Sequence, residues 1–189
     1  MAAGADVVLL ARAYAFAAAR HGGHRRKGLA QEPYINHLVE VAELVAEATE
    51  GTDAALVAAA VLHDVVEDTR TTAEEVRDGF GEDVAALVLE VTDDKGLPKA
   101  ERKRLQIVEA PRNSPRAKVI KLADKISNLS ALLVSPPADW PLERKREYLD
   151  WARQVVAGLR GVCPRLEAEF DAAAARLERA LAAGGVVPP

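Results

Sequence analysis

The sequence predicts an all-α protein of about eight to nine helices. Apolar residues recur with the 3.6-residue period of an α-helix along almost the whole chain, and no segment alternates convincingly as a strand would. Apolar residues make up 49% of the chain but aromatic residues only 4%, so alanine and leucine, which favour helix, must form the core. The length of 189 residues suits one domain, 1–189, with a core of about 5–160 and a C-terminal helix of about 164–183.

Caps and helix breakers predict the helices of the N-terminal half in order. Gly22-Gly23 ends the first helix, and Thr72 and Glu75 have the spacing of a capping box. The expected helices run from about Asp6 to His21, from Pro33 to about Gly51, from Thr52 or Asp53 to Asp68, from Thr72 onward, and from about Glu82 to Thr92.

The helices of the C-terminal half are predicted in the same way. Ser114 followed by Pro115 combines an N-cap with a first-turn proline, and Pro136-Pro137 separates two helices. The expected helices cover 99–109, 114–134, 139 to 158 or 161, and 164–184. No linker is long enough to divide the chain into separate domains.

Charge and composition exclude several classes of function. With 25 Lys and Arg against 29 Asp and Glu, the net charge of −4 argues against a nucleic-acid partner, although a small basic pocket for a phosphorylated metabolite is compatible with it. The longest apolar run has nine residues, 54–62, whereas a membrane span needs about 20. The single cysteine, Cys163, excludes an internal disulfide and a cysteine-built zinc site, so a cytoplasmic location is expected. The oligomeric state stays open.

The apolar run 54–62 is followed directly by His63-Asp64-Val65-Val66-Glu67-Asp68. A helix without any polar side chain should be buried on every side. Ionised groups at its end are costly unless something compensates them, and a cation is the obvious candidate. Helical spacing places His63, Asp64 and Glu67 on one side of the helix.

A second core helix, with apolar residues from 119 to 133, carries Asp124 and Asn128 on one face. His37, near the start of an earlier helix, adds an imidazole. The set of His37, His63, Asp64 and Asp124 suits a first-row divalent metal in a catalytic site, and composition leaves manganese, iron, cobalt and zinc open. The alternative is a buried His63–Asp64 hydrogen-bonded pair with His37 at the surface.

These four residues resemble the H…HD…D pattern of HD-domain metal-dependent phosphohydrolases. Longer segments are similar to the hydrolase domain of RelA/SpoT homologues, which degrade the alarmones ppGpp and pppGpp: 26–27, 33–37, 63–69 and 121–125 with Asn128. The segment 91–104 resembles that of small stand-alone alarmone hydrolases, including the metazoan ones. The resemblance therefore implies an HD-domain helical bundle that hydrolyses the 3′-pyrophosphate of ppGpp or pppGpp, giving GDP or GTP and pyrophosphate.

The resemblance also implies roles for individual residues. Manganese would be bound by His37, His63, Asp64 and Asp124. Glu67 and Asp68 would handle the attacking water, although they could instead be partners of the histidines or a helix-end charge pair. The nucleotide would contact Arg26, Lys27, Asn128 and Tyr148. Without the resemblance, the loop of Arg25 to Lys27 is expected to be ordinary surface, and Tyr148, at helical spacing beside Trp151, could equally be core.

Two features lie outside the motifs. The basic runs 99–104 and 144–146 are expected to be exposed helix faces. The family often has glycine, proline and arginine where this chain has Gln31, Leu38 and Ser130. Gln31 bears on the position of the loop over the nucleotide, and a helix accepts Leu38 without difficulty. Ser130 removes a possible phosphate contact, which bears on affinity more than on reaction type.

Three other functions compete with alarmone hydrolysis. The same site could serve an NADPH 2′-phosphatase or a hydrolase of adenosine alarmones. A non-catalytic nucleotide-binding regulatory module is the alternative from another class. The complete set of acidic residues argues against it, because a protein that only binds has no chemical need of Glu67.

Overall fold

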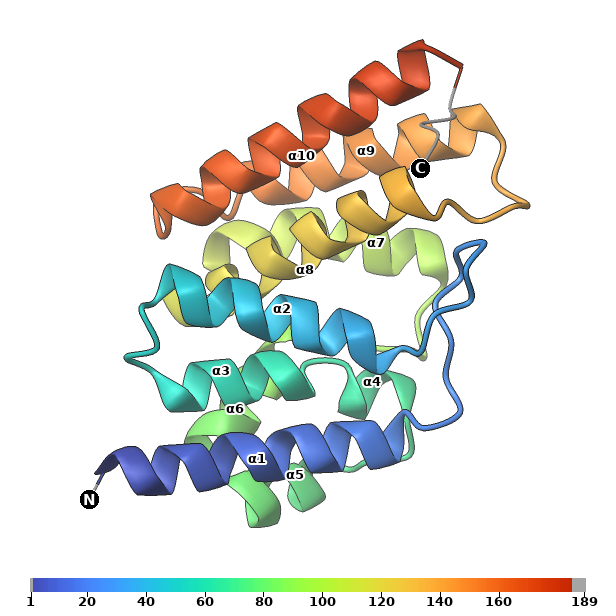
Figure 1. Cartoon of the computed structure of the whole chain (residues 1–189). Coiled ribbons are helices and arrows are strands. Elements are labelled where there is room, and N and C mark those ends of the chain that lie inside the picture. The colour runs from blue at the N-terminus through green and yellow to red at the C-terminus, as the bar shows by residue number, and fades with distance from the viewer. Residues whose placement is uncertain (1, 185–189) are drawn as a thin grey trace.

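Helices alone build the described part of the chain, residues 2–184 of a computed structural model (Figure 1), which confirms the all-α prediction. Only two residues, His63 and Asp64, separate the third helix from the fourth. The elements are α1 (Ala2–Arg20), α2 (Ile35–Ala48), α3 (Ala54–Leu62), α4 (Val65–Asp68), α5 (Ala73–Phe80), α6 (Glu82–Val91), α7 (Lys99–Glu109), the 3-10 turn η1 (Ala110–Arg112), α8 (Pro115–Val134), α9 (Leu142–Ala157) and α10 (Pro164–Ala182).

The predicted domain, 1–189, includes residues 1 and 185–189, which lie outside the described part of the chain. Its division into a core and a C-terminal helix stays a prediction. Within residues 2–184, no helix combines the length and the apolarity that crossing a membrane requires.

Three of the predicted helix starts are confirmed by side-chain caps. Asp53 accepts a hydrogen bond from the amide of Leu56 at the start of α3. Thr72 and Glu75 form both bonds of the capping box at the start of α5. Ser114 caps α8, with Pro115 in its first turn.

Several boundaries differ from the prediction, and helix α2 begins at Ile35 rather than at Pro33. Helix α1 begins at Ala2, so Asp6 lies inside it rather than at its N-cap. Helix α9 begins at Leu142 rather than near residue 139, because the ring of Pro141 disfavours helical backbone at the preceding residue. The helix expected to run to Asp68 is interrupted at His63. The ring of His63 bonds the carbonyl of Ala60, which the amide of Asp64 would use in a continuous helix.

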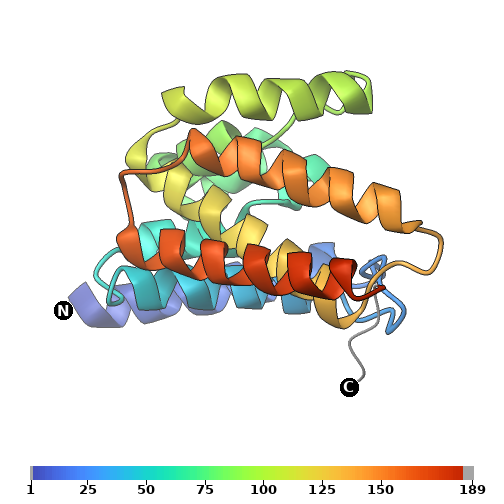
Figure 2. The same ribbon diagram turned by 90° about the horizontal axis from the view of Figure 1, so that it is seen from above.

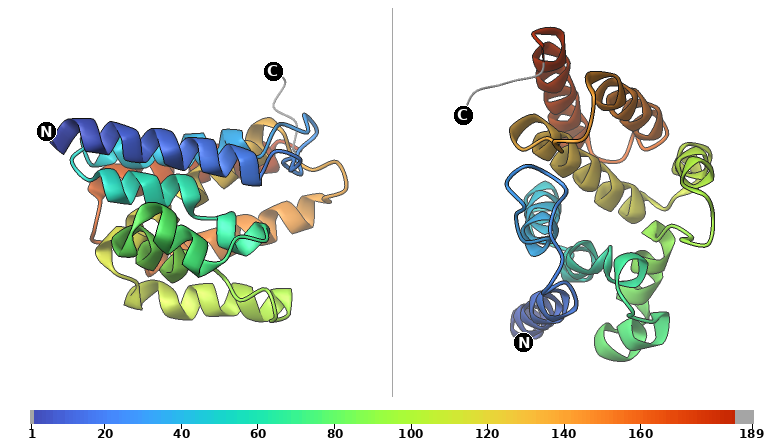
Figure 3. Two further views of the ribbon diagram at one scale, coloured as in Figure 1. Left: turned by 90° about the horizontal axis from the view of Figure 1, so that it is seen from below. Right: turned by 90° about the vertical axis from the view of Figure 1, so that its right-hand side faces the viewer.

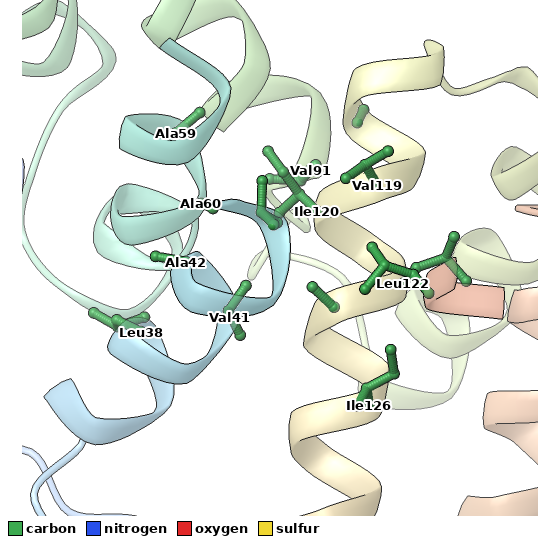
Figure 4. Packing of buried hydrophobic residues seen from close by; sticks show 14 of the residues in the cluster. Leu38, Val41, Ala42, Ala59, Ala60, Val91, Val119, Ile120, Leu122 and Ile126 are labelled. Atoms are coloured by element: carbon green, nitrogen blue, oxygen red, sulfur yellow. The ribbon is translucent and has the colours of Figure 1, made fainter. Parts of the chain in front are cut away.

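The core lies around α3 and α8. Residues 56–62 of α3 are buried, as predicted, and α3 packs against α1, α2, α6 and α8. In Figure 4 the labelled side chains of α2, α3, α6 and α8 share this core. Helices α9 and α10 pack against α8, and α9 lies between α7 and α10 in Figure 2. Helix α8 therefore joins the N-terminal helices to the C-terminal ones.

One edge of the molecule gathers the loop 21–34, α4 and the connection 135–141 (Figure 3, right). The amide of Leu29 donates to the carbonyl of Pro136, and the amide of Ala30 donates to Oγ of Ser135. A Cβ on Gly28 would lie 2.1 Å from the carbonyl oxygen of Ser135, so only glycine allows this approach. The basic loop is thus fastened to the end of α8.

Gly79 within α5 and Gly158 at the C-cap of α9 together test the packing. A Cβ at Gly158 would lie 2.8 Å from Pro111 and 2.9 Å from Ala110, whereas one at Gly79 would meet nothing within 4 Å. We expect Gly158→Ala to lower the free energy of unfolding by about 1–3 kcal/mol through overpacking. Gly79→Ala should raise it by about 0.5–1 kcal/mol, because alanine favours helix. Urea denaturation of both variants measures the difference, and equal effects would contradict the described packing.

Candidate metal centre

Three polar side chains converge from α2, the end of α3 and the middle of α8. The candidate ligand atoms of His37, His63 and Asp124 all lie within 4.8 Å of one another. Nε2 of His37 lies 3.3 Å from Oδ1 of Asp124 and 3.7 Å from Oδ2 of Asp64. Nε2 of His63 lies 3.2 Å from Oδ2 of Asp64. The structure thus brings three of the predicted ligands together and places the fourth, Asp64, beside both histidines.

Both imidazole rings are held by a partner on the side away from this centre. Nδ1 of His63 lies 2.8 Å from the carbonyl oxygen of Ala60, and Nδ1 of His37 lies 2.8 Å from Oγ of Ser127. Nε2 of His63 is buried and makes no hydrogen bond of acceptable geometry. Two Nε2 atoms and two carboxylates facing one buried point are a donor set that suits a divalent cation.

The charges of this cluster shift one another's pKa values. Burial alone would raise the pKa of Asp64, but the His63 ring holds it well below its usual range. The Lys125 ammonium, 2.8 Å from Oδ2 of Asp124, likewise keeps the pKa of Asp124 low against burial. Burial lowers the pKa of His37, whereas Asp64 and Asp124 outweigh burial and raise the pKa of His63 to about 9. Without a metal, a proton on His63 therefore supplies part of the positive charge.

Glu67 and Asp68 lie beside the centre, on α4. Oε2 of Glu67 accepts a hydrogen bond from the amide of Asp93, and the Lys95 ammonium lies 3.3 Å from Oε1 of Glu67 and 2.6 Å from Oδ1 of Asp68. Burial raises the pKa of Glu67, while the bond from Asp93 and the charge of Lys95 oppose the shift. Among the described residues, neither carboxylate bonds a histidine, so their partners are cations and a backbone amide.

A cleft of about 820 Å³ opens from this centre. Ten lysines and arginines line it, against six aspartates and glutamates. Four of the six, namely Asp64, Glu67, Asp68 and Asp124, lie at or beside the candidate metal centre. The rest of the wall is therefore strongly cationic although the whole chain carries a net charge of −4, which is the small basic pocket that the composition allowed.

The four predicted nucleotide-contacting residues all line this cleft: Arg26, Lys27, Asn128 and Tyr148. The guanidinium of Arg26 donates to Oδ1 of Asn128 at 3.2 Å. Nδ2 of Asn128 donates to Oδ1 of Asp124 at 2.6 Å, so this side chain connects the basic loop to the candidate ligands. Burial raises the pKa of Tyr148 to about 12, so its phenol stays neutral at physiological pH.

The expectation that the basic runs are only exposed faces is wrong for part of each run. Lys99, Arg102, Lys103 and Arg144 line the cleft. The Lys103 ammonium lies 4.6 Å from the ring centroid of Trp151, and the Arg144 guanidinium lies 4.3 Å from that of Trp140. The cations of α7 recur at i, i+3 and i+4, which is one helix face, and this spacing was the signal that sequence reasoning missed.

Tyr34 is a further residue that sequence reasoning missed. Its hydroxyl donates to Oδ2 of Asp64 at 2.6 Å, which orients one of the candidate ligands. Its ring stacks on that of His21, with centroids 5.0 Å apart. The position of Tyr34 three residues before His37, on one side of a helix start, could have indicated it.

The three departures from the family pattern have different structural consequences. Gln31 has a φ of +50°, in the left-handed region that glycine adopts without strain, so the loop keeps a conformation suited to the missing glycine. Leu38 is fully buried in the core and sits within α2. Ser130 lies half-buried on α8, outside the lining of the cleft.

Comparisons with known proteins agree with this geometry. A family profile described as "HD domain" matches residues 13–153. The protein of Xenopus tropicalis named guanosine-3′,5′-bis(diphosphate) 3′-pyrophosphohydrolase MESH1 is 49% identical over 166 residues, which span 88% of this chain and 93% of the frog protein. Its human namesake is 49% identical over 164 residues, spanning 87% of this chain and 92% of the human protein.

A solved structure, described by the words "A metazoan ortholog of SpoT hydrolyzes ppGpp and plays a role in starvation responses", has the same fold. It superimposes with a TM-score of 0.86 at 45% identity and covers 92% of this chain and 96% of the other. The match of profile, sequence and structure extends over most of the chain. The chain therefore belongs to the HD-domain family and, within it, to the group of the MESH1 proteins.

Proposed function

We propose that the protein is a metal-dependent guanosine-3′,5′-bis(diphosphate) 3′-pyrophosphohydrolase, which converts ppGpp or pppGpp to GDP or GTP and pyrophosphate. The observation that carries the proposal is a mixed histidine and carboxylate centre at one end of a cationic cleft. A nucleotide that carries phosphates at two positions suits such a cleft. The candidate metal site at one end of the cleft can meet one phosphate group, and the lysines and arginines of the wall can meet the other. The named activity of the MESH1 relatives supports this assignment.

The proposed metal ligands are His37, His63, Asp64 and Asp124, and the proposed ion is Mn²⁺. Imidazole nitrogens combined with carboxylate oxygens suit several first-row ions, and the resemblance to alarmone hydrolases is what favours manganese among them. A divalent ion held there supplies positive charge that polarises the phosphate and lowers the pKa of water. Asp64 is oriented for this role by the hydroxyl of Tyr34, and Asp124 by the amide of Asn128.

Glu67 and Asp68 are the proposed catalytic carboxylates. Glu67 would take the proton of the attacking water, and Asp68 would orient that water. Both carboxylates are paired with Lys95 before substrate arrives, and Glu67 also lies 3.6 Å from a guanidinium nitrogen of Arg102. These cations offset the negative charge of the two carboxylates and can also attract the leaving pyrophosphate.

The nucleotide would be held by the basic loop and by α8 and α9. The planar guanidinium of Arg26 can stack on a base, and Lys27 can meet a phosphate. Asn128 would contact the nucleoside, and the neutral phenol of Tyr148 would donate to phosphate oxygens. We infer that the chain acts as one catalytic unit, 1–189, on a small molecule in the cytoplasm, with no role for nucleic acid.

One assay tests the proposed function. Purified protein is offered ppGpp, pppGpp, their adenosine counterparts and NADPH, with Mn²⁺ and with a chelator, and the products are resolved. We expect pyrophosphate together with GDP or GTP, and loss of turnover with the chelator. Orthophosphate released from NADPH alone, or no turnover of any compound with Mn²⁺ present, would overturn the proposal.

A pair of variants separates metal binding from activation of water. Asp64→Asn should lose the metal, because a neutral amide is a poor substitute for a carboxylate ligand, and activity should fall with it. Glu67→Gln should keep the metal but lower kcat by about 10²–10⁴, the range for loss of a general base. Elemental analysis and kcat on ppGpp measure both effects. Wild-type kcat in Glu67→Gln, or metal loss as complete as in Asp64→Asn, would contradict the assigned roles.

Arg26→Ala and Lys27→Ala test the basic loop. Each removes a charged contact to an anionic substrate, which is worth about 10- to 100-fold in KM for ppGpp, while metal content should not change. Arg176→Ala is the matched control, because Arg176 is exposed on α10 and does not line the cleft. A KM equal to that of the control in both variants would show that the loop is ordinary surface.

A further inference from the structure

A buried chain of two hydrogen bonds leads from His37 away from the cleft, to a carboxylate that the proposed reaction does not use. Nδ1 of His37 lies 2.8 Å from Oγ of Ser127, and Oγ of Ser127 donates to Oε2 of Glu40 at 2.7 Å. His37 is 2% exposed and Ser127 is 0% exposed, so water does not compete for the bond between them, while Glu40 at the end of the chain is half-buried. Neither Ser127 nor Glu40 is among the residues that line the cleft.

The chemistry of the three groups determines where the protons lie. A serine hydroxyl has one hydrogen, and an ionised carboxylate can only accept. The hydroxyl of Ser127 therefore donates to Glu40 and turns a lone pair toward His37, so Nδ1 of His37 must carry the proton. A neutral imidazole has a single N–H, which leaves the lone pair of Nε2 facing Asp64 and Asp124.

We propose that Glu40 is a positioning residue, which acts through Ser127 to hold His37 in the tautomer that offers Nε2 to a divalent cation. The inference rests on the proposed metal centre and adds a residue to it that no motif contains. His63 has the same arrangement in a simpler form, because the carbonyl of Ala60 accepts its Nδ1–H directly. Partners of this kind commonly change metal affinity by about 10- to 100-fold.

The alternative tautomer shows why the carboxylate matters. Without Glu40, the hydroxyl of Ser127 is free to turn and donate to Nδ1 of His37. The proton of the neutral ring would then move to Nε2, where Oδ1 of Asp124, 3.3 Å away, can accept it. That proton would occupy the position of the cation, so Glu40 selects between a metal-binding ring and a ring that pairs with Asp124.

The test begins on metal-free protein near neutral pH. ¹⁵N NMR of labelled histidine distinguishes a proton on Nδ1 from one on Nε2. We expect Nδ1–H for His37 in the wild type and Nε2–H in Glu40→Ala. Glu40→Gln should restore Nδ1–H, because its side-chain carbonyl still accepts from Ser127.

Titration with Mn²⁺ alone then measures affinity. We expect Glu40→Ala and Ser127→Ala to bind Mn²⁺ about 10- to 100-fold more weakly than the wild type. Glu40→Gln should bind it nearly as well. Glu43→Ala is the matched control, because it removes an exposed carboxylate three residues further along α2.

The outcomes separate this role from simple packing. A bridge that only joins α2 to α8 would lower the Tm of Glu40→Ala while leaving the tautomer of His37 and the Mn²⁺ affinity equal to those of Glu43→Ala, and this result would overturn the positioning role alone. Wild-type protein that bound no Mn²⁺ would overturn the proposed metal centre and the positioning role with it.

Discussion

Two carboxylates and two imidazole nitrogens share one buried point, and their mutual repulsion must be offset by positive charge. Much of the structure around them serves this requirement. Lys125 contacts Asp124 from the same helix, and in the absence of metal a proton on His63 contributes the remainder. A divalent cation bound there would replace that proton with two charges.

This constraint also explains the interruption between α3 and α4. In a continuous helix, the carbonyl of Ala60 would accept from the amide of Asp64. The ring of His63 takes that carbonyl instead, which aims Nε2 into the centre. The short α4 then carries Glu67 and Asp68 to the adjoining wall, where Lys95 meets both carboxylates. The break between α3 and α4 therefore places His63, a candidate metal ligand, beside Glu67, the candidate general base.

The sequence predicted the parts of this arrangement that depend on local patterns. Caps at Asp53, Thr72 and Ser114 are encoded within a few residues, and the polar block after the apolar run 54–62 indicates a compensated cluster. The cationic face of α7, the bond from Tyr34 to Asp64 and the pairing of Ser127 with Glu40 were not predicted.

The missed contacts join residues far apart in the chain. The partners of the Tyr34 and Ser127 bonds are separated by 30 and 87 positions, and their meeting depends on how α2, α4 and α8 pack. A helical period reports which residues share a face, but it does not report which neighbouring helix that face meets.

The fastening of the loop 21–34 to residues 135 and 136 has an entropic consequence. A flexible basic loop would lose about 1–2 kcal/mol of backbone conformational freedom per residue when an anion ordered it. Here the amides of Leu29 and Ala30 are already bonded to Pro136 and Ser135, and the amide of Arg26 to the carbonyl of Glu32. Most of that loss is therefore incurred during folding, so an anion bound by this loop would mainly have the side chains of Arg26 and Lys27 left to order.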